Sequence, residues 1–312
     1  MAVVRNKSGS IDLLDPQTLA RIGGLELVAR TVVDGVMSGI HRSTHKGGCC
    51  EFDEHRLYAQ GDDLRLIDWR LFARRDRHYV KRFEDETNLH AWLVVDTSGS
   101  MLFGYSTMSK FDYARMGAAC LARLLLKQRD SIGLMLDVGG RRQAIPPRPQ
   151  ANHFLSIVER LQSCDAEGAP RLSETLQELA GRLKRRSLVV VFSDCFGDVP
   201  ELKHALQQLR LRGHDVLVFQ VLAPEEITFD FRTPALFEDL EARGVRLDIH
   251  PGALRRHYVE RFESFMRELH AAMIEIDCDC VTLSTDRDLG DSLAYYLRRR
   301  AARGRLQTGR TG

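Results

Sequence analysis

The chain has 312 residues, 44% of them hydrophobic, which suffices for one large domain or two modest ones with a packed core. Its 45 Lys and Arg residues nearly balance its 43 Asp and Glu residues, which excludes a global positive field that would attract nucleic acid or an anionic membrane. Seven cysteines without the spacing of a disulfide framework suit a reducing compartment. Because a signal pattern and a run of roughly 18 apolar residues are both missing, we expect a cytoplasmic protein without membrane insertion.

Residues 1–88 are expected to form an extension made of helices and a small sheet. Asp15-Pro16 is typical of a helix start, and apolar residues recur at helical spacing from Leu19 to Ile40. The segment 47–87 is dense in charges and aromatic residues, and the alternation at Tyr79 and Lys81 indicates a strand.

Residues 89–303 alternate apolar runs with amphipathic helices, which predicts an α/β domain with a doubly wound, mostly parallel sheet. The expected strands are 89–95, 131–138, 188–192, 216–222, 245–249 and 280–283, with an edge strand at 142–145. The expected helices are 110–128, 152–161, 172–183, 200–211, 254–274 and 289–300, followed by a basic tail at 304–312. Ligands of such sheets bind at the carboxyl ends of the strands, where the winding direction reverses, so the loops after the first and fourth core strands are the expected site.

Hard oxygen donors occur in both of these loops. Asp96-Thr97-Ser98-Gly99-Ser100 places one carboxylate and two hydroxyls on one tight turn, and Ser193-Asp194 follows the other strand. Such donors suit Mg²⁺ or Mn²⁺. The alternative is that Asp and Ser only cap helices and turns here. The spacing and the strand context favour a metal site made of Asp96, Ser98, Ser100 and Asp194.

The strand, the Asp-x-Ser-x-Ser loop and the later Ser-Asp resemble a von Willebrand factor A domain, in which such residues form the metal-ion-dependent adhesion site. In that family a further threonine completes the first shell of the ion, and a carboxylate of the partner takes the open coordination position. The resemblance therefore implies a protein that binds an acidic residue of its partner through a metal ion.

A second resemblance covers nearly the whole chain. The motifs that carry it are Glu51-Phe52, Glu54-His55-Arg56, Gly61-Asp62-Asp63-Leu64-Arg65, Ile67-Asp68-Trp69, Phe237-Glu238-Asp239-Leu240-Glu241 and Thr285-Asp286. They resemble the bacterial family known as domain of unknown function 58. This resemblance implies partnership with a MoxR-type AAA+ ATPase, with the A-like protein as adaptor or co-chaperone. The candidates for partner binding are Asp62, Arg65, Asp68 and Trp69, and the alternative for these residues is packing of the extension against the A-like domain.

One departure from the family pattern concerns the threonine. Aligning Gly168-Ala169-Pro170-Arg171-Leu172 with the pattern Gly-Gly-Thr-Asp-Leu puts Pro170 at the threonine position. Proline offers no side-chain oxygen, so binding of Mg²⁺ or Mn²⁺ is expected to be weak or absent unless Ser173 or Thr175 substitutes. Without an ion, the two aspartates would need another cation beside them, and Arg171 is the nearest candidate in sequence.

Together these patterns favour a non-enzymatic protein-binding module with an AAA+ ATPase as partner. The alternative from another class is a metal-dependent hydrolase or phosphatase that uses Asp96 and Asp194. Against it, Ser98 stands where a phosphatase-like aspartyl nucleophile has its second aspartate, and Thr97 to Met101 does not supply a Gly-x-Ser-x-Gly elbow. A nucleic-acid scaffold rests only on the arginine-rich tail from Arg298.

Overall fold

The computed structural model describes residues 89–293 apart from 170, 232–234, 239, 241–245 and 250, together with 25–26, 29–30, 32–34, 55–57 and 79–81. By its contacts the chain divides into two compact units, Ser38–Asn88 and Met1–Met37 with Leu89–Gly312. The expected extension over 1–88 therefore contributes residues to both units. Several predictions lie outside the described residues, namely those on Asp62, Arg65, Asp68, Trp69, Pro170 and the tail 304–312.

The unit Ser38–Asn88 contains two short strands, β1 (His55–Leu57) and β2 (Tyr79–Lys81). They pair antiparallel, with Arg56 opposite Val80. The strand expected from the alternation at Tyr79 and Lys81 is thus confirmed.

The larger unit is built around a six-stranded sheet in the order β10-β7-β6-β3-β4-β5. Neighbouring strands run parallel except β5, which is antiparallel to β4. This confirms the predicted doubly wound, mostly parallel sheet with its edge strand. The strands are β3 (His90–Val95), β4 (Ser131–Val138), β5 (Arg141–Arg148), β6 (Leu188–Ser193), β7 (Asp215–Leu222) and β10 (Asp279–Ser284).

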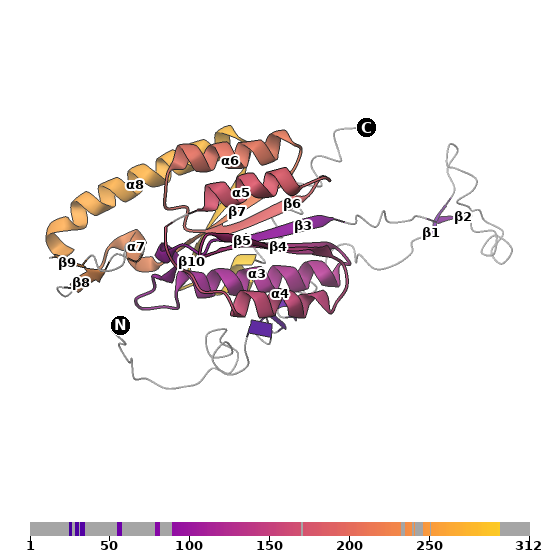
Figure 1. The fold of residues 1–312 in the computed structure, drawn as a ribbon, viewed down its shortest axis with the longest axis horizontal. Coiled ribbons are helices and arrows are strands. Elements are labelled where there is room, and N and C mark those ends of the chain that lie inside the picture. The colour runs from indigo at the N-terminus through magenta and orange to yellow at the C-terminus, as the bar shows by residue number, and fades with distance from the viewer. Residues whose placement is uncertain are drawn as a thin grey trace. The chain divides into compact units, whose positions relative to one another are not determined.

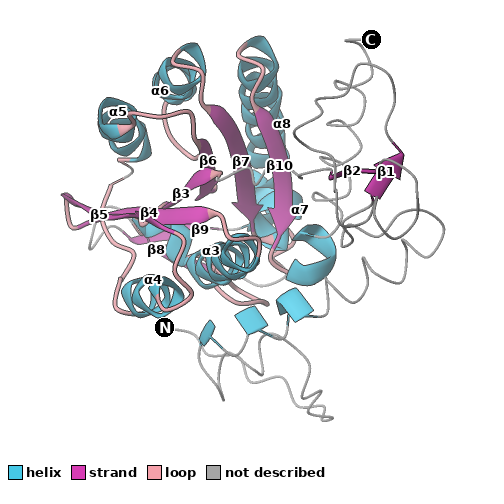
Figure 2. Ribbon diagram, turned by 90° about the vertical axis from the view of Figure 1, so that its right-hand side faces the viewer, coloured by secondary structure: helices cyan, strands magenta, loops and turns pink. Residues whose placement is uncertain are grey.

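Helices cover both faces of this sheet, as Figures 1 and 2 show. One face carries α3 (Lys110–Lys127) and α4 (His153–Gln162), and the other carries α5 (Leu172–Arg182), α6 (Val199–Leu211) and α8 (Pro251–Glu275). The central strands are apolar along their length because both of their faces are buried. None of the helices in the described part of the chain is long and apolar enough to cross a membrane.

Helix α3 packs closely against β6 at Gly117. It begins where the Ser109 hydroxyl accepts a hydrogen bond from the backbone N–H of Asp112, a standard N-cap. Further along, a Cβ added to Gly117 would lie 2.7 Å from the Phe192 ring, so the helix can approach β6 only because residue 117 has no side chain. This approach sets the position of Lys110, at the start of the helix, relative to the end of β6.

One predicted strand belongs elsewhere. Residues 245–249 were expected in the main sheet, but β9 (Arg246–Ile249) pairs antiparallel with β8 (Ala235–Glu238) in a separate two-stranded sheet. The sequence also did not predict α7 (Pro224–Thr228), a single turn after β7. A short segment of alternating polar and apolar residues predicts a strand but not its partner, which depends on contacts far along the chain.

The expected N-terminal helix is confirmed where the structure describes it. The described helical residues include Leu25, Ala29, Val32 and Val33, which are buried. Their spacing places them on one face of the helix. Asp34 forms an ion pair with Lys127 of α3, with 2.6 Å between Asp34 Oδ1 and Lys127 Nζ. This segment is therefore part of the larger unit.

Candidate functional site at the carboxyl edge of the sheet

The two predicted loops meet at the point where the sheet changes winding direction. Strand β3 has β4 on one side and β6 on the other, and both pairs are parallel. The carboxyl ends of β3 and β6 therefore lie next to each other, and the backbone N–H of Asp96 donates to the carbonyl of Phe192 over 2.9 Å. This is the position at which doubly wound sheets bind their ligands.

Asp96, Ser98 and Ser100 form what we call the outer cluster. Asp96 accepts from the backbone N–H of Ser98 at 2.9 Å through Oδ1 and from the Ser193 hydroxyl at 2.5 Å through Oδ2. The hydroxyls of Ser98 and Ser100 lie 3.1 Å apart. Burial raises the pKa of the Asp96 carboxyl above its usual range, and the negative charge of Asp194 raises it further.

Asp194 belongs to a second group of charges, which we call the inner cluster and which also contains Lys110 and Glu226. The Lys110 ammonium lies 2.7 Å from Asp194 Oδ2 and 2.5 Å from Glu226 Oε1. The side chains of Lys110 and Asp194 have no exposed surface, and that of Glu226 is 10% exposed. Burial raises the pKa of Glu226, and the charge of Lys110 opposes that rise.

The turn after Asp194 holds its carboxylate in place. Asp194 Oδ1 accepts from the backbone N–H of Phe196 at 2.9 Å, and the Ser193 hydroxyl accepts from the N–H of Cys195 at 2.8 Å. Cys195 adopts a left-handed conformation with φ of 60°, which is strained for a residue with a side chain. Its thiol is buried, and burial raises its pKa well above the usual range, so it is not an activated nucleophile.

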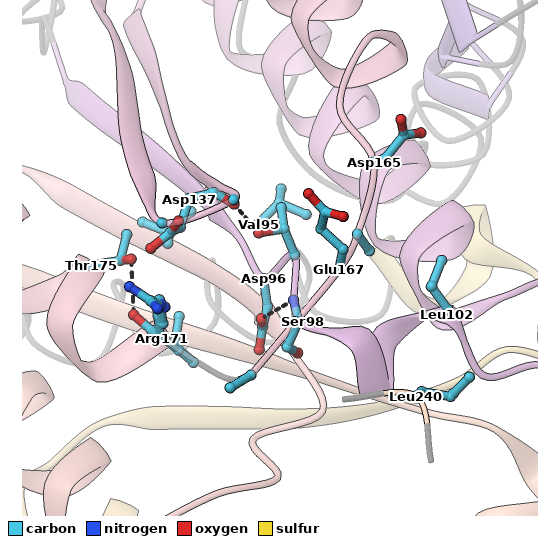
Figure 3. A pocket seen from close by; sticks show the side chains of 18 residues that line it. Val95, Asp96, Ser98, Leu102, Asp137, Asp165, Glu167, Arg171, Thr175 and Leu240 are labelled. Atoms are coloured by element: carbon cyan, nitrogen blue, oxygen red, sulfur yellow. Dashed lines mark hydrogen bonds between the residues drawn. The ribbon is translucent and has the colours of Figure 1, made fainter. Parts of the chain in front are cut away.

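A cavity of about 570 Å³ lies beside the outer cluster (Figure 3). The loop after α4 forms one wall, and two backbone hydrogen bonds of 2.8 Å fix it there: Gly99 N–H donates to Gly168 O, and Glu167 N–H donates to Thr97 O. Carboxylates of Asp96, Asp137, Asp165 and Glu167 line the cavity together with Arg171. Leu102 and Leu240 also line it, and they are 45% and 38% exposed.

The structure brings all four predicted ligands to one edge but divides them between two clusters. Asp96, Ser98 and Ser100 lie together, whereas Asp194 faces Lys110. The positive group that the paired aspartates require is Lys110 and not Arg171, whose guanidinium lies over the β4–β5 turn, 3.1 Å from where a Cβ of Gly140 would stand. Thr175 points its hydroxyl at the carbonyl of Arg171, 2.9 Å away within α5.

Sequence reasoning missed Lys110 and Glu226. A lysine at the first position of an amphipathic helix is read as solvent-exposed. Glu226 lies on α7, the turn of helix that was not predicted, 116 residues from Lys110. A sequence signal that could have pointed to burial is that Lys110 follows the strand-end loop and directly precedes Phe111.

The donor set fits a divalent ion in part. Within the described residues no group of three or more His, Cys, Asp or Glu side chains is arranged to hold a metal. The outer cluster offers the carboxylate of Asp96 and two hydroxyls, which are ligands of the kind that Mg²⁺ and Mn²⁺ accept. Asp194 does not fit, because Lys110 binds one of its oxygens and the Phe196 N–H binds the other.

The sheet order and the Asp-x-Ser-x-Ser loop at the switch point define an α/β domain of the von Willebrand factor A-like kind. Residues 54–266 match the family described as "Protein of unknown function DUF58". The chain belongs to this family.

The chain is also similar to other proteins and to solved structures. "Uncharacterized protein Rv1480" of Mycobacterium tuberculosis is 29% identical over 294 residues, which cover 93% of this chain and 92% of that protein. A conserved hypothetical protein BatB from Bacteroides thetaiotaomicron is similar with a TM-score of 0.45 and 15% identity, over 69% of this chain and 99% of that one. The SpRpn10 VWA domain is similar with a TM-score of 0.38 and 13% identity, over 66% and 94%.

Proposed function

We propose that the chain is a non-enzymatic protein-binding module that receives its partner at the carboxyl edge of the sheet, and that the partner is a MoxR-type AAA+ ATPase. The binding half of this proposal is supported by the geometry of the edge. The AAA+ half rests on the resemblance of the chain's motifs to its family, which implies such a partner.

The observation that carries the proposal is the cavity beside the outer cluster. It lies at the switch point, has a volume of about 570 Å³, and is lined by polar side chains and by two exposed leucines, Leu102 and Leu240. Exposed apolar side chains around polar groups are typical of surfaces that bind another protein. A partner side chain that entered here would meet the outer cluster directly.

The arrangement does not favour the hydrolase alternative. The Asp96 carboxylate is held by two donors, and Asp194 is held by Lys110, so neither is free to attack a substrate. Histidine and cysteine are absent from the residues that line the cavity, so a general base or thiol nucleophile would have to come from elsewhere. These observations support a binding role over a hydrolytic one.

We also propose that any divalent ion at this edge is held weakly, by Asp96, Ser98 and Ser100. An ion there would present an open coordination position to a carboxylate of the partner. The family threonine would be a further ligand, and its aligned position, Pro170, has no side-chain oxygen to offer.

Binding of the full chain to an AAA+ ATPase from the same organism tests the proposal, with two exposed leucines as a matched pair. Leu102 borders the cavity and is 45% exposed, whereas Leu211 is 79% exposed and ends α6 at the opposite, amino edge of the sheet. We expect Leu102→Ala to raise the dissociation constant roughly 5- to 30-fold, about 1–2 kcal/mol, and Leu211→Ala to leave it unchanged.

Equal affinity of the parent and the Leu102→Ala variant would show that the partner binds another surface. Turnover of a phosphomonoester or simple ester by the parent that disappears in Asp96→Asn would favour the hydrolase alternative instead.

A further inference from the structure

The inner cluster places one lysine between two carboxylates in the interior of the protein. The three residues come from different parts of the chain: Lys110 begins α3, Asp194 follows β6, and Glu226 lies on α7. Two carboxylates this close would repel each other strongly if no positive charge separated them. The ammonium at 2.7 Å and 2.5 Å from their oxygens removes that repulsion.

The surroundings of the ammonium keep it there. The Phe196 ring lies under Lys110 Nζ with 4.6 Å to its centroid, and the Phe103 ring lies at 5.9 Å. Aromatic faces attract a cation and exclude water, which strengthens the ion pairs in this cluster. A divalent ion at Asp194 would have to stand next to this positive charge or displace it, and Lys110 has no exposed surface through which to leave.

Hydrogen bonds next to the inner cluster join the loop before α3 to α7 and to the end of β10. Glu225, next to Glu226, accepts from the backbone N–H of Ser106 at 3.1 Å and from the Ser106 hydroxyl. The hydroxyls of Thr107 and Thr285 lie 2.6 Å apart, which joins the loop before α3 to the end of β10. The ion pair of Lys110 with Glu226 is thus close in sequence, on both sides, to residues that join these loops.

We propose that Lys110 is a positioning residue that serves as the built-in cation of this site, binding Asp194 and Glu226 in place of a divalent ion. The carboxyl edge then keeps its geometry without metal, and a divalent ion meets only the outer cluster. This inference rests on the site proposed above but not on the identity of the partner.

Binding of Mn²⁺ to the full chain tests the inference, because Asp194 is a ligand of the ion only if Lys110 does not occupy it. The variants are Asp194→Asn, Lys110→Ala and the double variant, with Lys127→Ala as control. Lys127 is the last residue of the same helix, and its ion pair with Asp34 is exposed. Titration calorimetry measures the affinity, and the melting temperature with EDTA or with excess Mn²⁺ measures the effect on the fold.

We expect Asp194→Asn and Lys127→Ala to have the same affinity for Mn²⁺ as the parent. If the parent does not bind Mn²⁺, neither variant should bind it. Lys110→Ala frees two carboxylates, so its affinity for Mn²⁺ is expected to rise by about tenfold or more, and its melting temperature is expected to respond to Mn²⁺ more than that of the parent. The double variant Lys110→Ala/Asp194→Asn is expected to lose this gain.

Two results would overturn the inference. One is a loss of about tenfold or more in Mn²⁺ affinity in Asp194→Asn alone, which would make Asp194 a metal ligand despite Lys110. The other is a folded Lys110→Ala variant that binds Mn²⁺ no more tightly than the parent. If Lys110→Ala does not fold, the Asp194→Asn comparison decides. Since these measurements use no partner, their failure would leave the binding assay with the AAA+ ATPase unaffected.

Discussion

The ion pairs at the amino and carboxyl edges of the main sheet differ in how far they are buried. At the amino edge, ion pairs lie at the surface: Arg210 Nη2 binds Asp277 Oδ2 at 2.6 Å, and Asp277 is 94% exposed. At the carboxyl edge, Lys110 and Asp194 pair with no exposed surface at all. Exposed pairs contribute little to stability, whereas removing one member of a buried pair leaves an unpaired charge in the interior.

The amino edge buries two histidines and the carboxyl group of Asp130, which accepts a hydrogen bond from the backbone N–H of Leu89 at 3.1 Å. His153 donates from Nε2 to the carbonyl of Ile132 at 2.9 Å near the start of β4, and His214 is buried just before β7. Burial lowers the pKa of both imidazoles, which keeps them uncharged. The carboxyl edge differs in that an ammonium pairs there with two carboxylates in the interior.

The largest effect is expected from Lys110→Met, which leaves Asp194 and Glu226 buried without a cation. The variant should lose about 3–5 kcal/mol of the free energy of unfolding, measured by urea denaturation at neutral pH. Lys127→Met, in the exposed pair with Asp34, should lose at most about 1 kcal/mol. A Lys110→Met variant as stable as the Lys127→Met control would mean that the two edges do not differ in this way.

A smaller effect is expected from Gly117→Ala, which pushes α3 away from β6. The added Cβ would stand 2.7 Å from the Phe192 ring, so the variant should lose about 1–3 kcal/mol of stability as the helix shifts. Gly181, on α5, has open space around it, and Gly181→Ala should gain up to about 1 kcal/mol from helix propensity. Thermal melts of the two variants check the contrast, and equal shifts would argue against the close approach of α3.

The two buried histidines of the amino edge predict that the free energy of unfolding depends on pH. The expected change is smaller than the loss expected from Gly117→Ala. Their pKa values in the fold lie below the usual 6.5, so the unfolded chain binds more protons as the pH falls. The free energy of unfolding should be fully retained above about pH 6.5 and should fall as the pH drops below it. Urea denaturation at pH 7.5 and 5.5 should show a smaller difference in His153→Gln than in the parent; an unchanged difference would indicate that the fold does not lower the pKa of His153.

The smallest change in stability is expected from Ser100→Ala, in the outer cluster. The serine is partly exposed and its hydroxyl meets only that of Ser98 among the hydrogen bonds of the described residues, so the loss should be below about 1 kcal/mol. Any Mn²⁺ affinity of the parent should nevertheless fall by on the order of tenfold. An unaffected Mn²⁺ affinity would place the ion, if one binds, outside the outer cluster.

Much of the fold could be predicted from local pattern. The apolar runs placed β3, β4, β6 and β7 within one or two residues, because strands buried on both faces are largely apolar. The edge strand β10 was placed equally well, although it has fewer apolar residues and is mostly not buried. Strand β9 was assigned to the wrong sheet, because four residues of alternating character pair equally well with β8 or with an edge strand of the main sheet.

The residues of the candidate site also fall into those that the sequence could identify and those that it could not. Asp96, Ser98 and Ser100 could be found from the sequence because they lie within five residues of one another directly after a strand, and Asp194 could be found because it ends another strand. The sequence by itself thus determined the sheet, the edge at which the polar residues gather and the family. Only the tertiary structure decided which cation faces Asp194. The Lys110 pairs span 84 and 116 residues, and an electrostatic contact between such distant positions depends on how α3, β6 and α7 pack, which no local pattern specifies.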